Sequence, residues 1–252
     1  MIDSFRLDEK VAIVTGASTG LGQGICQGFA GAGARIAGVS RSSMAETRQL
    51  VEAAGAPFLA IQADLISLDP IEPIISQVLE SFGRIDILVN NAGIIRREDA
   101  INFTEKDWDD VLNINAKSMF FLSQAVARQF MKQGEGGKII NIASMLSFQG
   151  GIRVPSYTSS KSAVKGMTMA LANEWAKYNI NVNAIAPGYM VTNNTEALRA
   201  DPQRSADILA RIPAGRWGNP ADIAGTAVFL ASRASDYVHG FTMAVDGGWL
   251  AR

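Results

Sequence analysis

The sequence predicts an α/β fold in which one parallel sheet of about seven strands carries helices on both faces, a doubly wound arrangement. Three observations predict it. Short runs rich in β-branched and apolar residues recur along the chain, and most of them lack the polar alternation of a half-exposed strand. The segments between these runs are long enough for helices, which allows consecutive strands to lie parallel.

The predicted strands span residues 10–15, 35–40, 57–62, 84–89, 137–143, 180–187 and 241–246. Thr104 is placed to cap a helix that begins at Glu105, and Asn219 followed by Pro220 has the pattern of a cap and a first helical position. Residues 188–218 show no strand pattern, so we expect a partly helical flap over the sheet edge.

The amino-acid composition limits the classes of protein to which this chain can belong. With 48% hydrophobic residues and no linker or repeat, residues 1–252 are expected to form a single domain. The 23 basic and 24 acidic residues give a net charge of −1, which predicts no nucleic-acid and no membrane partner. A charged beginning and the lack of an apolar run of ~20 residues predict a cytoplasmic protein. The single Cys26 fits a reducing compartment and core packing.

A glycine-rich stretch follows the first predicted strand directly. In "TGASTGLG", residues 15–22, Gly16, Gly20 and Gly22 stand where the chain must turn tightly and begin a helix. The N–H groups at a helix N-terminus attract anions, so a pyrophosphate is the expected occupant. The spacing G-x-x-x-G-x-G differs from the common G-x-G-x-x-G dinucleotide fingerprint, and a plain strand-to-helix turn stays open as the alternative.

Tyr157 and Lys161 stand four residues apart in what reads as a helix. This spacing places an ammonium beside a phenol on one helix face, which favours phenolate and lowers the phenol pKa from its usual value near ~10. The pair is thus a candidate acid/base. Such pairs are also common surface neighbours, which is the competing interpretation.

Four motifs, taken in their order along the chain, identify a resemblance to a known protein family. "TGASTGLG" (15–22), "NNAG" (90–93), "SYTSSK" (156–161) and "APG" (186–188) resemble the short-chain dehydrogenase/reductase family along nearly the whole chain. The resemblance implies a Rossmann-like fold, an NAD(P)(H)-dependent oxidoreductase and a homotetramer. It implies that the chemistry is carried by Asn115, Ser144, Tyr157 and Lys161.

The roles of these residues follow from the resemblance. Tyr157 would protonate the carbonyl oxygen, Lys161 would lower its pKa and bind the nicotinamide ribose, and Ser144 would donate to the same oxygen. Asn115 would hold a water in the proton path. Besides Tyr157 and Lys161, the implied cofactor contacts are Gly16, Ser18, Thr19, Gly20, Leu21, Gly22, Arg41, Asp64, Leu65, Asn91, Ala92, Gly93, Pro187, Gly188 and Thr192, and Asn90 belongs to the same close backbone approach.

The end of the second strand bears on the choice of nicotinamide cofactor. An acidic residue there would bind the ribose 2′-hydroxyl of NAD, whereas an arginine would accommodate the 2′-phosphate of NADP. The sequence "GVSRSS" has Arg41 and no acid, which favours NADP(H). A solvated Arg41 beside a pocket that takes either cofactor stays open, and the relatives that the chain resembles most are NAD-linked.

Further stretches such as "RREDA" (96–100) and "IPAGRWG" (212–218) resemble the sugar-acid dehydrogenases of that family. A small sugar acid needs a cation for its carboxylate, and arginine binds carboxylates with two parallel hydrogen bonds. We expect at least one of three arginines near the site to do this, with Ser144 and Tyr157 at the reacting carbon; surface ion pairs are the alternative for Arg96, Arg97 and Arg153.

Other functions compete with this one. A second enzyme hypothesis is a reductase of gluconate or 5-ketogluconate, a polyol or a 3-oxoacyl thioester, and a third is a redox-inactive dinucleotide sensor or scaffold. The lone His239 has no His, Cys or acidic cluster around it in the sequence, so we expect a structural role and no metal. We expect the tryptophans to pack helices, the flap or a subunit interface: Trp108, Trp175, Trp217 and Trp249.

Overall fold

A computed structural model describes residues 2–252 and has one seven-stranded sheet among them, in the order β3-β2-β1-β4-β5-β6-β7. All six pairs of neighbouring strands are parallel. The predicted fold class is therefore confirmed, and each predicted strand has its counterpart. The bounds are β1 Val11–Thr15, β2 Arg35–Ser40, β3 Phe58–Gln62, β4 Ile87–Asn90, β5 Gly137–Ile142, β6 Ile180–Pro187 and β7 Thr242–Val245.

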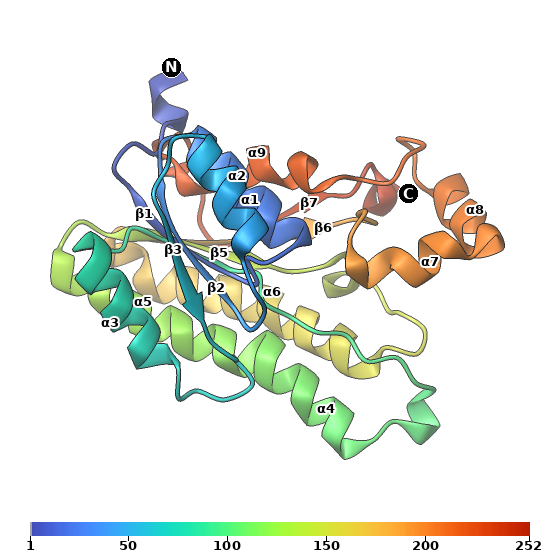
Figure 1. Cartoon of the computed structure of the whole chain (residues 1–252). Helices are drawn as coiled ribbons and strands as arrows, with labels where there is room; N and C mark the ends of the chain where they lie inside the picture. Colours follow the sequence, from blue (N-terminus) through green and yellow to red (C-terminus); the bar gives the residue numbers. More distant parts are fainter. Residues whose placement is uncertain (1) are drawn as a thin grey trace.

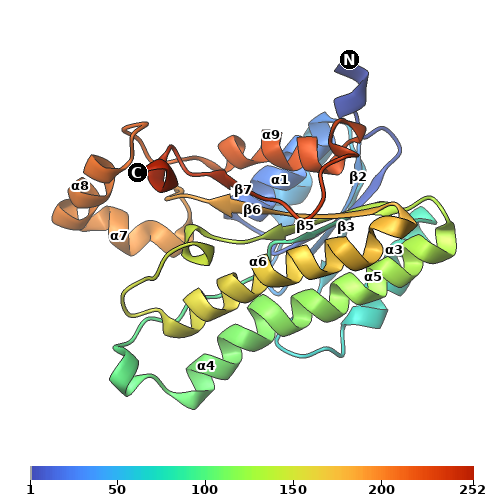
Figure 2. The same ribbon diagram turned by 180° about the vertical axis from the view of Figure 1, so that it is seen from behind.

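Helices cover both faces of the sheet (Figures 1 and 2). On one face α1 (Gly20–Gly31), α2 (Ala45–Ala53) and α9 (Pro220–Ala231) share an apolar core with strands β1 and β2. On the other face a second core joins the sheet to α3 (Ile71–Phe82), α5 (Met119–Gln133) and α6 (Pro155–Trp175), while α4 (Glu105–Leu112) packs beside α6.

The central strands are apolar on both sides because both sides are covered. All residues of β1, β4 and β6 are buried, with no alternation. The chain leaves β3 at one edge and returns to pair β4 with β1, so the direction of strand order reverses between β1 and β4. In open parallel sheets the crevice at such a reversal, beyond the carboxyl ends of the strands, is where ligands bind.

Both predicted helix caps are present. Thr104 Oγ1 accepts a hydrogen bond from the backbone N–H of Asp107 at 3.1 Å, at the start of α4. Asn219 forms a reciprocal capping box with Asp222, and Pro220 occupies the first turn of α9. These local signals set where the two helices begin.

The segment expected to form a flap, residues 188–218, contains α7 (Glu196–Ala200) and α8 (Pro202–Arg211). Met190 and Gly218 form an isolated β-bridge that closes the base of this segment. In both views α7 and α8 stand beyond one end of the sheet, beside the end of the chain (Figures 1 and 2). We keep the name flap for residues 188–218.

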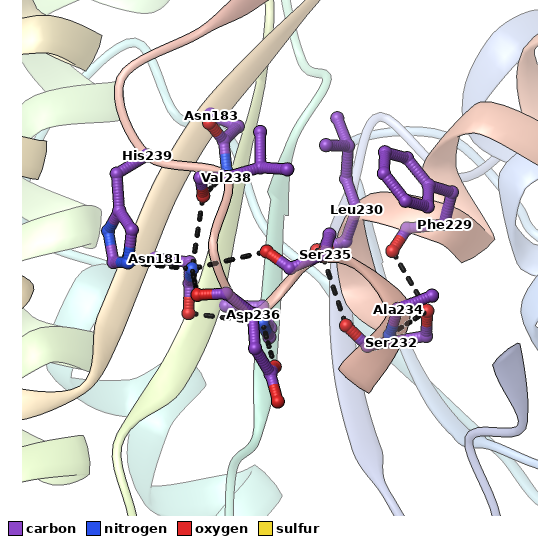
Figure 3. A network of polar contacts seen from close by, with 11 residues as sticks. Asn181, Asn183, Phe229, Leu230, Ser232, Ala234, Ser235, Asp236, Val238 and His239 are labelled. Carbon is purple, nitrogen blue, oxygen red and sulfur yellow. Dashed lines mark hydrogen bonds and ion pairs between the residues drawn. The ribbon is translucent and has the colours of Figure 1, made fainter. Parts of the chain in front are cut away.

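The edge strand β7 is held by two asparagines of β6 (Figure 3). Asn183 Nδ2 donates to the carbonyl oxygen of Val238 at 2.7 Å, and its Oδ1 accepts from the N–H of Phe241 at 3.0 Å. Asn181 Nδ2 lies 3.1 Å from Nε2 of His239 and 2.9 Å from the carbonyl oxygen of Asp236. In this structure His239 thus lies in the loop that leads into β7 and contacts Asn181 of β6.

Candidate active site

A cavity of about 310 Å³ lies at the carboxyl ends of the central strands. Predicted residues from five separate segments line it. They are Gly16, Ser18, Thr19, Gly20, Leu21, Asn91, Ala92, Gly93, Ser144, Tyr157, Lys161, Pro187, Gly188 and Thr192. The fold therefore brings the glycine loop and the Ser, Tyr and Lys side chains to one place.

The glycine loop leaves no room for side chains at its closest point. A Cβ built on Gly22 would lie 2.2 Å from the carbonyl oxygen of Gly16, and Gly16 itself has φ of +65°. Asn91 Nδ2 donates to the carbonyl oxygens of Thr15 and Gly16 at 2.9 and 3.1 Å, which fixes the loop against β4. Gly22 does not line the cavity; it supports the turn in which Gly16 and Gly20 do. This cradle fits a pyrophosphate at the start of α1.

Tyr157 and Lys161 lie one turn apart at the start of α6, where Pro155 occupies the first turn. Lys161 Nζ lies 5.6 Å from the centre of the Tyr157 ring and donates to the carbonyl oxygen of Ile142 at 2.5 Å. Ser144 follows β5 and has an extended backbone, and its Oγ accepts from the N–H of Leu146 at 3.2 Å. The cavity holds all three polar groups at the end of β5.

Burial dominates the protonation of these groups. It raises the pKa of the Tyr157 hydroxyl, and a hydrogen bond with Ser144 and the charge of Arg97 only partly offset this. Burial also lowers the pKa of Lys161 to about 8. The sequence predicted that Lys161 would lower the pKa of Tyr157; in this structure the net direction is the opposite, because desolvation of the phenolate outweighs the favourable contacts.

Asn115 lies behind the cavity and does not line it. It occupies a π-helical turn, Asn113–Ser118, between α4 and α5, a kind of insertion often found at functional sites. Its Oδ1 accepts from the N–H of Ile94 at 2.9 Å, and its Nδ2 donates to the carbonyl oxygen of Ile94 and to Ser160 Oγ at 3.0 and 3.1 Å. Asn115 therefore ties the segment after β4 to α6.

The three arginines expected near the substrate differ in their partners. Arg96 pairs with Asp107 at 3.1 Å, and Arg153 pairs with Asp99 at 3.1 Å. Arg97 has no acidic partner among residues 2–252; its Nη2 donates to the carbonyl oxygen of Asn194 at 3.1 Å. Its charge also acts on Tyr157, so it is the arginine whose field reaches the candidate acid/base.

Arg41 lies just beyond β2, with its side chain 73% exposed and Nη1 3.7 Å from Oδ2 of Asp64. The guanidinium is thus free to meet a phosphate in solvent. Leu65 is buried, and its carbonyl oxygen accepts from Ser118 Oγ at 2.6 Å. Arg41, Asp64 and Leu65 lie outside the 310 Å³ cavity, along the continuation of the same sheet end.

Several lining residues were not predicted as site residues. Asn193, Asn194 and Thr195 form the turn after Thr192, and Thr192 and Thr195 cap it reciprocally. The polar run "TNNT" directly after the "APG" motif was the signal that could have found them. The other unpredicted lining residues are Ile142, Ala143 and Met190.

A larger hollow of about 820 Å³ lies at the opposite, amino ends of the strands. None of the predicted site residues lines it. Several of its charged groups pair with each other, as in Lys10 with Asp86 and Lys138 with Asp236. The larger of the two cavities is therefore not the candidate active site. Within the described chain no cluster of three or more His, Cys, Asp or Glu side chains could hold a metal, and no helix of that part could span a membrane.

Comparison with known proteins gives consistent matches. A family model described as Enoyl-(Acyl carrier protein) reductase matches residues 16–250. The chain is 65% identical over 252 residues, the full length of both sequences, to a 2-dehydro-3-deoxy-D-gluconate 5-dehydrogenase of Escherichia coli (strain K12).

Two solved structures are similar throughout. One, from Agrobacterium tumefaciens, is provisionally named a 2-deoxy-d-gluconate 3-dehydrogenase and contains NADP; it is 54% identical with a TM-score of 0.91, and 99% of each chain is covered. The other, from Beutenbergia cavernae, is provisionally named an NAD(P)-dependent gluconate 5-dehydrogenase and contains NADP at low occupancy. It is 47% identical with a TM-score of 0.94, covering 99% of this chain and 100% of that one.

Proposed function

This chain belongs to the short-chain dehydrogenase/reductase family, and from that premise we propose that its substrate is 2-dehydro-3-deoxy-D-gluconate, with 2-deoxy-D-gluconate as the second candidate. As a family member it is an oxidoreductase that transfers a hydride between NAD(P)(H) and a CH–OH or carbonyl carbon of a sugar acid. The observation that carries the substrate proposal is the full-length similarity to an enzyme named for that sugar acid.

The side chains of the cavity support a simple division of labour. A bound reduced nicotinamide supplies the hydride to the carbonyl carbon. Tyr157 Oη then gives a proton to the carbonyl oxygen, and Ser144 Oγ donates a hydrogen bond to the same oxygen as negative charge develops there. Lys161 donates once to Ile142, so two of its N–H groups are left for ribose hydroxyls. The carbonyl group thus gains one hydride at its carbon and one proton at its oxygen, which gives the alcohol.

The raised pKa of Tyr157 suits the direction of reduction. A buried phenol that keeps its proton at neutral pH is ready to act as the acid. Oxidation requires the phenolate, which the hydrogen bond with Ser144 and the positive charge of Arg97 favour. We therefore expect the oxidation rate to rise with pH in the alkaline range and the reduction rate to fall.

Arg97 is the arginine that we assign to the substrate carboxylate. Its hydrogen bond to the carbonyl oxygen of Asn194 is a bond to a neutral acceptor, and a carboxylate is the stronger partner for a guanidinium. Arg96 and Arg153 already have carboxylate partners. Arg97→Ala should therefore raise KM for the sugar acid about 10- to 100-fold, while Arg153→Ala should change it much less. Equal effects of the two substitutions would remove Arg97 from this role.

The direct test is the initial rate of the purified protein with 2-dehydro-3-deoxy-D-gluconate, 2-deoxy-D-gluconate and gluconate, each with NAD(H) and NADP(H). Turnover of a deoxy acid at a kcat/KM at least tenfold above that for gluconate is expected. A preference for gluconate would move the proposal to the second enzyme hypothesis, which the Beutenbergia cavernae structure favours.

Tyr157→Phe tests the acid/base and the non-enzymatic alternative together. It should lower kcat by at least 1000-fold and leave dinucleotide binding within threefold, because only the hydroxyl is lost. Tyr178→Phe, an exposed tyrosine after the same helix, is the matched control. Comparable turnover by Tyr157→Phe and the control would contradict the assigned role.

We also propose a homotetramer in the cytoplasm, with a small sugar acid as its only other partner class. Two places carry exposed apolar side chains: Phe121 on α5, and Met169 of α6 with Tyr237 and Phe241 around the loop that leads into β7. A tetramer with two kinds of twofold interface would cover both. The single Cys26 is free and buried, so the described fold contains no disulfide, which fits a reducing compartment.

A further inference from the structure

The last turn that the structure describes, Trp249–Ala251, packs against the flap (Figure 1). Trp249 is 5% exposed and shares an apolar cluster with Ile208 and Ile212 of the flap. The guanidinium of Arg211, at the end of α8, lies 4.0 Å from the centre of the Trp249 ring. This turn is therefore bound to the flap by apolar and cation–π contacts.

The same tryptophan reaches the loop that follows Ser144. Trp249 Nε1 donates to Oε1 of Gln149 at 3.3 Å, and Arg211 Nη2 donates to the same oxygen at 3.5 Å. Gln149 stands five residues after Ser144. Met145, the neighbour of Ser144, also belongs to the apolar cluster of Trp249. One carboxamide oxygen thus joins the last turn, the flap and the loop that carries Ser144.

An aromatic contact extends this connection to the cavity wall. The ring of Tyr189 lies 4.8 Å from the Trp249 ring and 5.5 Å from the Trp217 ring. Tyr189 directly follows Gly188, which lines the cavity. Phenylalanine would supply a smaller aromatic ring for these contacts, but it lacks the N–H that is aimed at Gln149. The indole N–H is the feature that packing alone does not explain.

We propose that Trp249 and Gln149 are positioning residues for hydride transfer. The indole N–H holds the Gln149 carboxamide and so fixes residues 144–149, which keeps Ser144 Oγ beside Tyr157. The opposite end of this loop is fixed by β5, and its middle is fixed by Ser147 Oγ, which donates to the carbonyl oxygen of Lys161 at 2.6 Å. This proposal rests on the proposed function, because it takes Ser144 as the donor to the substrate oxygen.

The first test compares two tryptophans. Trp249→Phe keeps an aromatic ring for Tyr189 and Arg211 and removes the donor together with part of the ring, a loss of volume that the control below shares. Trp175→Phe is the matched control, because Trp175 is 7% exposed in the last turn of α6, at the other end of that helix from Tyr157. Trp249→Phe should lower kcat about 5- to 20-fold with KM for NADPH unchanged within twofold. Trp175→Phe should stay within twofold in both.

The hydrogen bond itself is tested by a double-mutant cycle. Gln149→Leu should lose at least as much kcat as Trp249→Phe, because it also removes the contact with Arg211, and the double variant should lose no more than Gln149→Leu, because both substitutions remove the bond between Trp249 and Gln149. An unchanged kcat in Trp249→Phe, or losses that multiply in the double variant, would overturn the proposal.

A measurement without substrate separates this proposal from the proposed function. In hydrogen–deuterium exchange, Trp249→Phe should raise exchange in residues 144–150 and 203–211, and leave residues 11–31 unchanged. Unchanged exchange in the first two segments would reject the positioning role whatever the substrate is. Failure of the wild-type protein to use any sugar acid, with the exchange difference present, would reject only the substrate assignment.

Discussion

Lys161 is 5% exposed, with its Nζ directed at the carbonyl oxygen of Ile142 and no carboxylate beside it among the residues described. Burial lowers its pKa to about 8, which means that the fold is destabilised by the charged form. Groups that destabilise the fold in this way gather at functional sites, because the chemistry needs them there. The position of Lys161 thus indicates function independently of the motif.

Lys161→Met should therefore stabilise the protein while it removes activity. At neutral pH both the folded and unfolded states bind the proton, and the folded state carries the desolvation penalty, at most ~3 kcal/mol from the difference between about 8 and 10.5. Loss of the bond to Ile142 reduces the gain to ~1–2 kcal/mol. The penalty fades as pH rises from about 8 to 10.5, so the advantage of the variant should shrink over that range. Urea unfolding at pH 7 and pH 10 measures this; a constant difference would contradict it.

Arg41 is the residue whose exposure leaves it available for a 2′-phosphate. Arg41→Ala should raise KM for NADPH about 10- to 100-fold and change KM for NADH less than threefold, because only NADPH carries that phosphate. Arg48→Ala removes the same charge from the next helix, where Arg48 pairs with Glu52, and serves as control. Steady-state kinetics with both cofactors measures the two KM values. An equal rise in KM for NADH and NADPH would mean that Arg41 does not bind the phosphate.

At the scale of elements, α1 shows how one helix contains two kinds of glycine. A Cβ on Gly22 would lie 2.2 Å from the carbonyl oxygen of Gly16, whereas a Cβ on Gly31 would meet nothing within 4 Å. Helix propensity treats these positions alike. The contact with the glycine loop distinguishes them. A side chain at Gly22 would displace that loop, whereas a side chain at Gly31 has room.

Gly22→Ala should weaken NADPH binding at least 50-fold and lower stability by ~1–3 kcal/mol, because backbone atoms must move to admit the methyl group. Gly31→Ala should leave binding unchanged and alter stability by no more than ~1 kcal/mol, in the stabilising direction. Cofactor titration and thermal unfolding of both variants check this pair. Normal NADPH affinity in Gly22→Ala would show that the loop has room that the structure lacks.

Local sequence patterns predicted the helices and strands, but not which side chains contact each other across the fold. The strand predicted at 84–89 spans Ile87–Asn90, and Asp86 just before it bonds Val11 twice, through its backbone N–H to the carbonyl oxygen of Val11 at 2.9 Å and through its carboxylate, which accepts from the N–H of Val11 at 3.0 Å. The two helices of the flap could not be located, since the long-range cluster with Trp249 supports them. Likewise, the neighbours Asp99 and Asp107 decide which arginine stays unpaired, and no spacing rule encodes that.

At the scale of the molecule, exposed apolar side chains occur at two places: Phe121 on α5, and Met169 of α6 with Tyr237 and Phe241 around the loop that leads into β7. Phe121→Glu and Tyr237→Glu should each convert a tetramer to a dimer, and the double variant should be a monomer, because each charge blocks one interface. Ile66→Glu, a half-exposed apolar residue after β3, should leave the tetramer intact. Sedimentation velocity measures the species, and a wild-type monomer would refute the assembly.

The strand order has a consequence for synthesis on the ribosome. Residues up to Gln62 supply only the β3-β2-β1 half of the sheet, so the edge of β1 that faces β4 stays unpaired until residues 87–90 emerge. A largely apolar strand that is buried along its whole length in the folded protein is prone to pair with another chain while its edge is open. The nascent protein is therefore most prone to misassembly while α3 is being synthesised. This tendency ends when β4 pairs with the open edge of β1.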